Sequence, residues 1–555
     1  MEQIWLKNYP KEVPATIDAD QYASLVDLLE RAKMEFASRT AYISMGDIRT
    51  YAEIEQRSRY FAGYLQSIGL KKGDRIALML PNILQHPIAL FGILRAGMTV
   101  VNVNPLYTPR EMSHQLIDSG AVAIVALDAF SKTLKEALEI APIKHIILTS
   151  VGDQLSFIKR RFVNFVIKYI KKGVPKISFV NAIKFNSAIK QGALFDYQRP
   201  EIKPDDIAFL QYTGGTTGVS KGAMLTHRNM LANLAQAKAV FGPVFNEQVQ
   251  TIVTALPLYH VFALTVNCML MIDNGGTSLL IANPRDMKTT LKEMARTPFT
   301  VITGVNTLFS GFLRQEAFHQ LNFSKLRICV GGGMPVHKNV ANDWLKATGC
   351  HLLEGYGLTE CSPLVAVNPY NITHYTGSIG LPVPSTDVRL VDDNHQDVPL
   401  GSAGELWVRG PQVMKGYWNN HSATHDIMEG DWLKTGDIAT MDDMGFIRIV
   451  DRKKEMILVS GFNVYPSEIE DIVMQHPKVL EAAAIGLPNE QTGELIHVCV
   501  VKKDNSLTEE EIIAFCKQNL TGYKIPRKVT FHEDLPKSNV GKILRRELKT
   551  QFLAK

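Results

Sequence analysis

The stretch that decides the fold reads Tyr212-Thr213-Gly214-Gly215-Thr216-Thr217-Gly218-Val219-Ser220-Lys221-Gly222, directly after an apolar run at residues 207–210. Glycines let a backbone fold tightly with its N–H groups free, hydroxyls add further donors, and a lysine adds positive charge. These groups are the parts that a polyphosphate-binding loop needs. We therefore interpret the stretch as a phosphate loop between a strand and a helix.

Two alternatives to this interpretation can be weighed from the residues. The common P-loop requires Gly-Lys followed directly by Ser or Thr, but Lys221 lies between Ser220 and Gly222. P-loop kinases and GTPases are therefore disfavoured. A flexible linker rich in Gly, Ser and Thr would not explain a single lysine set between a strand and a helix.

The sequence on both sides of the loop alternates helical patterns with short apolar runs. Helical patterns cover residues 58–68 and 110–118, and buried strands are expected at 121–127, 145–148 and 253–256. Alternation of this kind predicts an α/β fold with largely parallel strands. A chain of 555 residues also exceeds the size of a single core, so at least two folding units are expected.

The last hundred residues have a different pattern. Short strands are expected at residues 456–460, 482–487 and 497–502. Two helices beside them each begin with a candidate capping box, Ser467 with Glu470 and Thr508 with Glu511. This pattern predicts a separate small α+β domain.

We place the domain boundary in the charged cluster 451–455, because such a cluster is unexpected inside a buried strand. The prediction is a large domain at residues 1–450 and a small domain at 451–555, with a hinge at Asp451 and Arg452. A solvated turn within one domain explains the cluster equally well at this stage.

Composition indicates a packed protein without a nucleic-acid partner. Hydrophobic residues make up 46% of the chain, and 60 basic residues face 55 acidic ones, too even a balance to indicate nucleic acid. The six cysteines show no paired spacing, so a reducing cytosol is expected and neither a zinc site nor a disulfide framework. No export pattern and no apolar run near the roughly 18 to 20 residues of a spanning helix is found, so any membrane contact must be peripheral.

Residues 157–172, FIKRRFVNFVIKYIKK, contain no acidic residue. Helical spacing places these residues on one face: Arg160, Arg161, Asn164, Lys168, Lys171 and Lys172. The remaining surface carries Ile158, Phe162, Val163, Phe165, Val166, Ile167, Tyr169 and Ile170. Separate basic and apolar faces suit an anionic membrane surface, where each basic residue adds roughly 1 kcal/mol. A surface helix whose apolar side packs on the core of the protein itself is the alternative, and both remain open.

Four further motifs follow the phosphate loop in order. They are Tyr356-Gly357-Leu358-Thr359-Glu360, Thr435-Gly436-Asp437, Asp451-Arg452, and the stretch from Pro536 to Gly541-Lys542. With the loop, they resemble the adenylate-forming superfamily of acyl-CoA synthetases, luciferases and amino-acid-activating domains. The resemblance runs from end to end, and residues 101–110 and 461–466 are most similar to bacterial long-chain fatty-acid CoA ligases.

The resemblance implies a fold and a reaction. The fold would be α/β, with a large multi-subdomain N-terminal adenylate-forming domain and a small mobile α+β C-terminal domain. The reaction would convert ATP, a fatty acid and coenzyme A into acyl-CoA, AMP and diphosphate through an acyl-adenylate, with Mg²⁺ as the metal. The protein is then expected in the cytoplasm, peripherally associated with the inner face of the cell membrane. A homodimer remains open.

The resemblance also assigns residues to the nucleotide. These are Thr213, Gly214, Gly215, Thr216, Thr217, Gly218, Lys221, Gly333, Tyr356, Gly357, Thr359, Asp437, Arg452 and Lys454. Tyr356 would pack on the adenine, Asp437 would accept the ribose hydroxyls, and Thr213 and Glu360 would bind Mg²⁺. Each alone has an ordinary alternative, since Tyr356 fits a core aromatic and Glu360 a helix cap. Their order along the chain favours the functional interpretation.

The catalytic residues implied by the resemblance are Lys542, Glu360, Lys221 and His260. The small domain would swing about the hinge, insert Lys542 for adenylate formation, and then remove it to admit the CoA thiol. The alternative for Lys542 is a solvated lysine in a basic tail. His260 would lie near the acyl carboxylate and the pantetheine arm, but a structural histidine is equally compatible. Apolar residues at 305–312 would line an acyl tunnel or simply form core.

Departures from related families separate the rival functions. Some long-chain relatives carry a gating tryptophan where this chain has Leu264, which puts that gating device in doubt. Amino-acid-activating domains place an aspartate after an aromatic where this chain has Phe262-Ala263, and no carrier domain is expected after Lys555. A medium-chain or aryl acid CoA ligase remains an alternative. A non-catalytic lipid-binding membrane scaffold is another, although Lys221, Glu360, Asp437 and Lys542 are all present.

Overall fold

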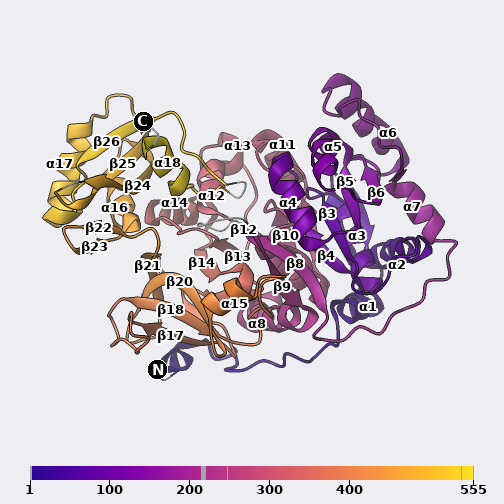
Figure 1. Cartoon of the computed structure of the whole chain (residues 1–555), viewed down its shortest axis with the longest axis horizontal. Helices are drawn as coiled ribbons and strands as arrows, with labels where there is room; N and C mark the ends of the chain where they lie inside the picture. The colour runs from indigo at the N-terminus through magenta and orange to yellow at the C-terminus, as the bar shows by residue number, and fades with distance from the viewer. Residues whose placement is uncertain (1–2, 214–219, 247, 490, 539–540, 554–555) are drawn as a thin grey trace.

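The computed structural model of the chain describes residues 3–213, 220–246, 248–489, 491–538 and 541–553. Figure 1 shows a large body, coloured from indigo to orange, and a small yellow body formed by the C-terminal residues. In the described part of the chain, no helix combines the length and the apolar character that crossing a bilayer requires.

A seven-stranded sheet carries the phosphate loop. Its order is β7 (Ala182–Lys184), β6 (His145–Thr149), β5 (Ala123–Leu127), β3 (Arg75–Met79), β4 (Thr99–Asn102), β8 (Ile207–Thr213) and β9 (Lys221–Thr226). All neighbours are parallel except β8 and β9, which form an antiparallel pair with Thr213 opposite Lys221.

The expectation that the loop leads from a strand into a helix is therefore wrong. The residues after the loop form β9, because they pair with β8 and bury Ala223 and Leu225. Helix α8 (His227–Phe245) begins only after this strand, where Thr226 and Asn229 form a reciprocal capping box.

A nine-stranded sheet lies beside the first. Its order is β16 (Leu381–Pro382), β15 (Leu364–Val367), β14 (Leu352–Gly357), β13 (Ile328–Gly332), β12 (Val301–Gly304), β10 (Thr251–Thr254), β11 (Thr277–Leu280), β1 (Thr40–Ser44) and β2 (Asp47–Thr50). The strands from β14 to β1 are parallel, and the outer ones are antiparallel. Parallel strands bring their carboxyl ends to one edge, where α/β proteins bind ligands.

Helices cover the two large sheets. They include α1 (Leu25–Phe36), α2 (Tyr51–Ser67), α3 (Gln85–Arg95), α4 (Pro109–Ser119), α5 (Ser131–Ile140), α7 (Phe185–Gly192), α11 (Met287–Arg296), α12 (Asn306–Leu313) and α14 (Lys338–Thr348). One apolar core joins both sheets through α2, α3 and α8. The predicted helices at 58–68 and 110–118 are confirmed by α2, which ends one residue earlier at Ser67, and by α4. The strand expected at 253–256 runs instead from Thr251 to Thr254.

A third sheet is antiparallel and ends at the predicted hinge. Its strands are β17 (Asp387–Val391), β18 (Gly404–Arg409), β19 (Met428–Glu429), β20 (Trp432–Met441) and β21 (Ile447–Arg452). The β20–β21 pairing places Asp437 directly opposite Arg452. A β-ladder therefore brings two of the predicted nucleotide-binding residues together.

The small domain begins beyond β21 and is α+β, as the sequence predicts. Its sheet contains β22 (Ile457–Val459), β23 (Phe462–Val464), β24 (Val479–Asn489), β25 (Gly493–Lys502) and β26 (Lys528–His532). Its helices are α16 (Pro466–Val473), α17 (Glu509–Asn519) and α18 (Arg545–Leu553). Figure 1 shows this domain above the third sheet, at the opposite end of the molecule from α6.

The two predicted capping boxes of the small domain have different outcomes. The box of Thr508 and Glu511 at α17 is confirmed. The box of Ser467 and Glu470 is wrong, because α16 begins at Pro466 with Tyr465 as its N-cap residue. Long-range partners occupy both groups: the Ser467 N–H donates to Asp451, and the Glu470 carboxylate accepts from Arg545.

The amphipathic segment forms α6 (Phe157–Phe165) and a following π-helical turn, η3 (Val166–Ile170). Its large apolar side chains are exposed, including Phe157, Ile158, Phe162, Phe165, Tyr169 and Ile170. Exposure of Ile158 reaches 80% of its surface, so these side chains do not pack on the core. Asn164 instead faces the protein, where it accepts from the Gly152 N–H and donates to Asp153.

Candidate active site

The third sheet and β14 build one end of the site from Tyr356, Asp437 and Arg452. The Tyr356 hydroxyl donates to Asp437 Oδ2 at 2.5 Å, and Arg452 Nε lies 3.2 Å from Asp437 Oδ1. Asp437 is buried, and its own N–H donates to the Thr435 hydroxyl at 3.1 Å. Burial and the neighbouring carboxylate raise the pKa of Tyr356 well above its ordinary value. The tyrosine therefore stays a hydrogen-bond donor that holds the carboxylate in place.

The phosphate-loop end brings Lys221 toward Glu360 through a residue that the motifs did not include. The Tyr417 hydroxyl donates to Glu360 Oε1 at 2.6 Å, and Lys221 Nζ lies 5.2 Å from the centre of the Tyr417 ring. Burial, followed by the charge of Glu360, raises the pKa of Tyr417. No sequence signal marked Tyr417, because it lies far along the chain from both residues that it joins.

Five predicted nucleotide-binding residues cannot be placed. Gly214, Gly215, Thr216, Thr217 and Gly218 lie outside the described residues. The two ends of their loop are described, and Thr213 is paired with Lys221 across the β8–β9 ladder.

Two other predicted nucleotide-binding residues, Gly357 and Gly333, are at positions where the backbone favours glycine. A Cβ at Gly357 would lie 2.1 Å from the carbonyl oxygen of Pro363, so no other residue fits without moving the backbone. Gly333 has a φ of +75°, a left-handed conformation that glycine adopts without strain. Thr359 begins the short 3₁₀ helix η5 (Thr359–Cys361), which presents Glu360.

Lys542 lies at the Asp437 end of the site although it belongs to the small domain. Burial, followed by the positive charge of Arg452, lowers its pKa from the ordinary value to about 8. The carboxylates of Glu455 and Asp437 oppose this shift. The chain therefore holds two cations beside one buried carboxylate, an arrangement suited to an anionic substrate.

Direct contacts hold the small domain against the large one here. A Cβ at Gly541 would lie 2.5 Å from Thr307 Oγ1, so the loop of Lys542 touches the start of α12. His337 Nδ1 lies 3.5 Å from Asp471 Oδ1 across the same boundary. Burial, and to a smaller degree the charge of Asp471, raises the pKa of Glu354 on β14 to about 8. Lys454, in contrast, is exposed and forms no ion pair with any residue that the structure describes.

His260 lies at the end of a loop that side-chain amides hold. Its Nδ1 accepts from the Phe262 N–H at 3.4 Å, and burial lowers its pKa to about 4, so the imidazole is neutral at pH 7. Gln211 donates to the backbone carbonyl of the preceding residue at 2.6 Å. Asn82 donates to two further carbonyls of this loop and accepts from the Leu258 N–H at 2.8 Å. Sequence reasoning did not find Asn82 or Gln211.

Two other expectations concern apolar residues. Phe309 and Phe312, within the stretch assigned to an acyl tunnel, are fully buried in a core with Trp344. Leu264 is also fully buried, in the π-helical segment η4 (Leu264–Leu270). These side chains act as core in the structure, and a tunnel along them stays a prediction.

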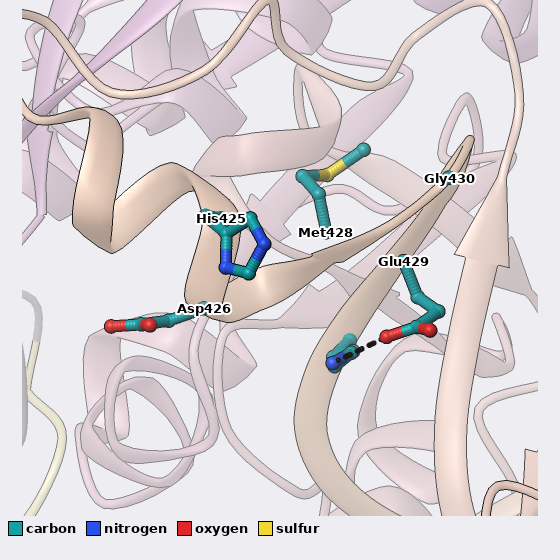
Figure 2. Close-up of a pocket in the computed structure, with 6 residues that line it drawn as sticks. His425, Asp426, Met428, Glu429 and Gly430 are labelled. Carbon is teal, nitrogen blue, oxygen red and sulfur yellow. Dashed lines mark ion pairs between the residues drawn. The ribbon is translucent and has the colours of Figure 1, made fainter.

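A surface hollow of about 610 Å³ lies elsewhere, between α15 (His421–Ile427) and the β19–β20 hairpin (Figure 2). His425, Asp426, Met428, Glu429, Gly430 and Lys434 line it. Lys434 and Glu429 pair with each other at 2.9 Å, and no predicted site residue is among the six. Within the described residues, no group of three or more His, Cys, Asp or Glu side chains could hold a metal ion.

The fold and these motifs define a class of protein. The model of the AMP-binding enzyme family matches residues 29–418, and that of the AMP-binding enzyme C-terminal domain matches residues 468–542. The chain therefore belongs to the AMP-binding enzyme family, which confirms the resemblance inferred from the five motifs.

Particular relatives cover the whole chain. A long-chain-fatty-acid–CoA ligase of Yersinia pestis is 61% identical over 99% of this chain and 98% of the relative. A second long-chain-fatty-acid–CoA ligase, from Haemophilus influenzae, is 53% identical over 100% of this chain and 99% of the relative. Among solved structures, an anthranilate CoA ligase in complex with anthranoyl-AMP matches with a TM-score of 0.84 and 25% identity, over 97% of this chain and 99% of that one.

Proposed function

We propose that the protein is an AMP-forming long-chain fatty acid–CoA ligase. It would convert ATP, a fatty acid and coenzyme A into acyl-CoA, AMP and diphosphate through an acyl-adenylate. One observation carries the chemistry: Asp437 of the large domain forms an ion pair with Arg452, and the charges of both residues act on the buried amine of Lys542 in the small domain. The full-length likeness to long-chain-fatty-acid–CoA ligases supports the choice of substrate.

The first half-reaction must replace the carboxylate oxygen of the acid, which is a poor leaving group for attack by a thiol, with AMP, which is a good one. A carboxylate oxygen of the fatty acid attacks the α-phosphorus of ATP, the bond to the β-phosphate oxygen breaks, and diphosphate leaves. Negative charge is spread over the phosphates throughout, so cations and fixed donors are needed more than an acid–base pair. Arg452 and Lys542 supply the cations at the adenosine end, and Lys221 supplies one at the phosphate end.

Asp437 would accept the ribose hydroxyls. An ionised carboxylate has two oxygens and about four lone-pair sites, so it can keep Tyr356 and Arg452 and still accept two more donors. Tyr356 lies near the end of β14, which runs parallel to β13, and the predicted nucleotide-binding residue Gly333 directly follows β13. This arrangement supports Tyr356 and Gly333 as neighbours of the nucleotide.

Mg²⁺ fits the residues present at the phosphate end. Glu360 receives a hydrogen bond from Tyr417 on one oxygen, and in the described part of the chain no Lys or Arg pairs with it. A free carboxylate oxygen is a suitable ligand for a hard cation that also binds substrate phosphates. Glu360 and Thr213 would hold the ion, which when bound neutralises phosphate charge.

The second half-reaction requires Lys542 to leave. The thiol of coenzyme A attacks the acyl carbonyl and AMP departs, and this step needs access that the closed domain blocks. We place the hinge at Asp451 and Arg452, between residues 1–450 and residues 451–555. The contacts of the small domain near Thr307 and His337 include polar groups, which suits an interface that opens in each cycle.

Release of diphosphate from ATP on adding an acid tests the proposal. Palmitate should stimulate release strongly, and acetate, coumarate and amino acids weakly. An aryl acid as the best substrate would favour the alternative of an aryl acid CoA ligase, and no acid-dependent release would contradict the enzyme. A chain-length series would then define the preferred fatty acid.

We also propose that α6 and η3 bind the anionic inner face of the cell membrane. Six large apolar side chains are exposed there, and the charged residues that line a hollow of about 400 Å³ beside them are Arg160, Arg161 and Lys168 with one acidic residue, Asp153. None of these three cations forms an ion pair with a described residue, although the charge of Lys168 acts on Asp128; Arg160 and Arg161 lie over the ring of Phe157, and Lys168 lies over that of Tyr169. Unpaired cations beside exposed aromatic residues complement an anionic lipid surface.

Vesicle binding tests the membrane proposal. Reversal of Arg160, Arg161, Lys171 and Lys172 to Glu should weaken binding to phosphatidylglycerol vesicles and leave activity on detergent-dispersed substrate unchanged. A matched control reverses four exposed cations of the small domain, Lys503, Lys517, Arg527 and Lys528. If both sets weaken vesicle binding equally, binding depends only on the net charge of the protein. If the first set leaves binding unchanged, α6 does not contribute to it.

A further inference from the structure

Arg545, the first residue of α18, lies at the centre of a cluster of carboxylates. Its Nε and Nη2 donate to the two oxygens of Glu470 at 2.8 and 2.6 Å, a bidentate pair. Its Nη1 donates to Glu455, and its Nη2 donates to the Ser467 hydroxyl at 3.1 Å. Nη1 also lies 3.6 Å from Asp451 Oδ1. One side chain thus joins the hinge, the segment after the hinge and α16.

The two hinge residues face opposite domains. Asp451 is buried, and its side chain contacts the small domain, accepting from the Ser467 N–H at 2.7 Å and approaching Arg545. Arg452 instead pairs with Asp437 of the large domain. A rotation about this dipeptide would therefore turn the partners of Asp451 relative to those of Arg452.

The segment between Arg545 and Lys542 is short and tightly turned. The Leu544 N–H donates to the Pro536 carbonyl at 2.8 Å, and Ile543 forms an isolated β-bridge with Lys537. Arg545 and Lys542 therefore belong to one short segment with fixed backbone contacts, and a movement of Arg545 relative to the hinge would carry Lys542 with it. The charge of Arg545 is also among the groups that lower the pKa of Lys542, after burial and Arg452.

We infer that Arg545 is a positioning residue for adenylate formation, which holds Lys542 at a set distance from the hinge through its fork of contacts to Asp451, Glu455 and Glu470. This inference rests on the proposed two-step reaction. Arg545 touches no reacting atom in it. Its function depends on the planar guanidinium, because a lysine at this position would keep the charge but could not reach several acceptors at once.

The competing explanation is that Arg545 only stabilises the small domain. Three carboxylates surround it, and removing the charge altogether would leave them unpaired and could unfold the domain. The conservative variant Arg545→Lys avoids this loss of charge. Glu455→Gln is a milder second variant, because it weakens one arm of the fork and leaves the bidentate pair with Glu470 intact.

The test separates the two half-reactions in the full-length enzyme. Adenylate formation is measured as palmitate-dependent diphosphate release, and CoA transfer is measured from supplied palmitoyl-AMP. Lys549→Gln is the matched control, because Lys549 lies on the same helix and pairs with Glu494 at 2.9 Å, away from the hinge. Thermal unfolding of each variant is recorded alongside.

We expect Arg545→Lys to lower the kcat of adenylate formation by about tenfold to a hundredfold, the cost of displacing a reacting group by roughly 1 Å. The KM for ATP and the rate of CoA transfer should change less than about twofold, since Asp437 and the rest of the large domain are intact. Glu455→Gln should also lower adenylate formation more than CoA transfer, by a smaller factor. Lys549→Gln should lower neither rate.

Equal losses in both half-reactions, or no loss in either, would overturn the inference. A loss matched by Lys549→Gln would likewise assign Arg545 to general stability. Failure of the proposed function has a separate signature, because the unmodified protein would then release no diphosphate in the presence of palmitate.

Discussion

Asp437 and Lys542 lie at the same end of the site but are held in place differently. Asp437 is buried, sits opposite Arg452 in a β-ladder, and has hydrogen bonds from Tyr356 and an ion pair with Arg452. Lys542 is placed by its loop, and its amine forms no hydrogen bond or ion pair with any residue that the structure describes. The contacts of the large domain thus fix Asp437, whereas in the proposed mechanism Lys542 is present only while the two domains are in contact.

The strongest test of this difference is Lys542→Ala. It should lower adenylate formation by about a thousandfold or more, because the variant removes a cation that stabilises charge in the transition state. CoA transfer from supplied acyl-AMP should remain largely intact, since the second pose does not use this lysine. Rapid-quench measurement of each half-reaction checks the prediction, and equal failure of both would contradict the two-pose account.

Asp437→Asn should affect both half-reactions, in contrast to Lys542→Ala. The nucleotide is bound in each step, and the amide is a weaker acceptor for the ribose hydroxyls and a poor partner for Arg452. We expect the KM for ATP to rise by about tenfold or more, and CoA transfer from acyl-AMP to weaken in parallel. Isothermal titration with AMP provides an independent measurement. An effect confined to adenylate formation would remove the contrast between the two residues.

Gly541→Ala should act through the domain contact. The new Cβ would lie 2.5 Å from Thr307 Oγ1, and the φ of +84° is already unfavourable for alanine. We expect adenylate formation to fall by about tenfold, with CoA transfer less affected. Adding Thr307→Ala should restore part of the loss, because it removes the clashing oxygen but not the backbone strain. A double variant no better than the single one would show that strain alone is responsible.

The smallest predicted effect is on pH dependence. The pKa of Lys542 is lowered to about 8, so the amine loses its positive charge as the pH rises through this value. The kcat/KM of adenylate formation should be full below pH 7 and should decline to roughly a quarter by pH 8.5. CoA transfer should not show this decline. In Arg452→Gln, the loss of a neighbouring cation should shift the decline to higher pH.

The candidate site was partly accessible from the sequence. Tyr356, Asp437, Arg452 and Lys221 could be named because each belongs to a local motif. Tyr417, which joins the Lys221 side to Glu360, could not, because its position depends on a contact between distant segments. The same limit explains why Asn82 and Gln211 were not found, since their side chains hold the backbone of a distant loop, the one that ends at His260.

The fold class was predictable from the hydrophobic periodicity of the sequence. Alternating helices and parallel strands, and the change to α+β near the end, follow from patterns that repeat over a few residues. The incorrect helix after the phosphate loop and the incorrect cap at Ser467 share one cause. In both cases a partner remote in sequence, strand β8 or the hinge carboxylate Asp451, determines the local hydrogen bonds.

The sequence alone therefore determined the family, the order of the motifs and the chemical groups available for the reaction. The tertiary structure decided which of those groups meet: it placed Lys542 beside Asp437, joined Glu360 to Lys221 through Tyr417, linked Arg545 to the hinge, and exposed the apolar side of α6. The physical reason is that motifs record local backbone needs and side-chain chemistry. Distances between segments far apart in sequence arise only when the sheets and the two domains pack.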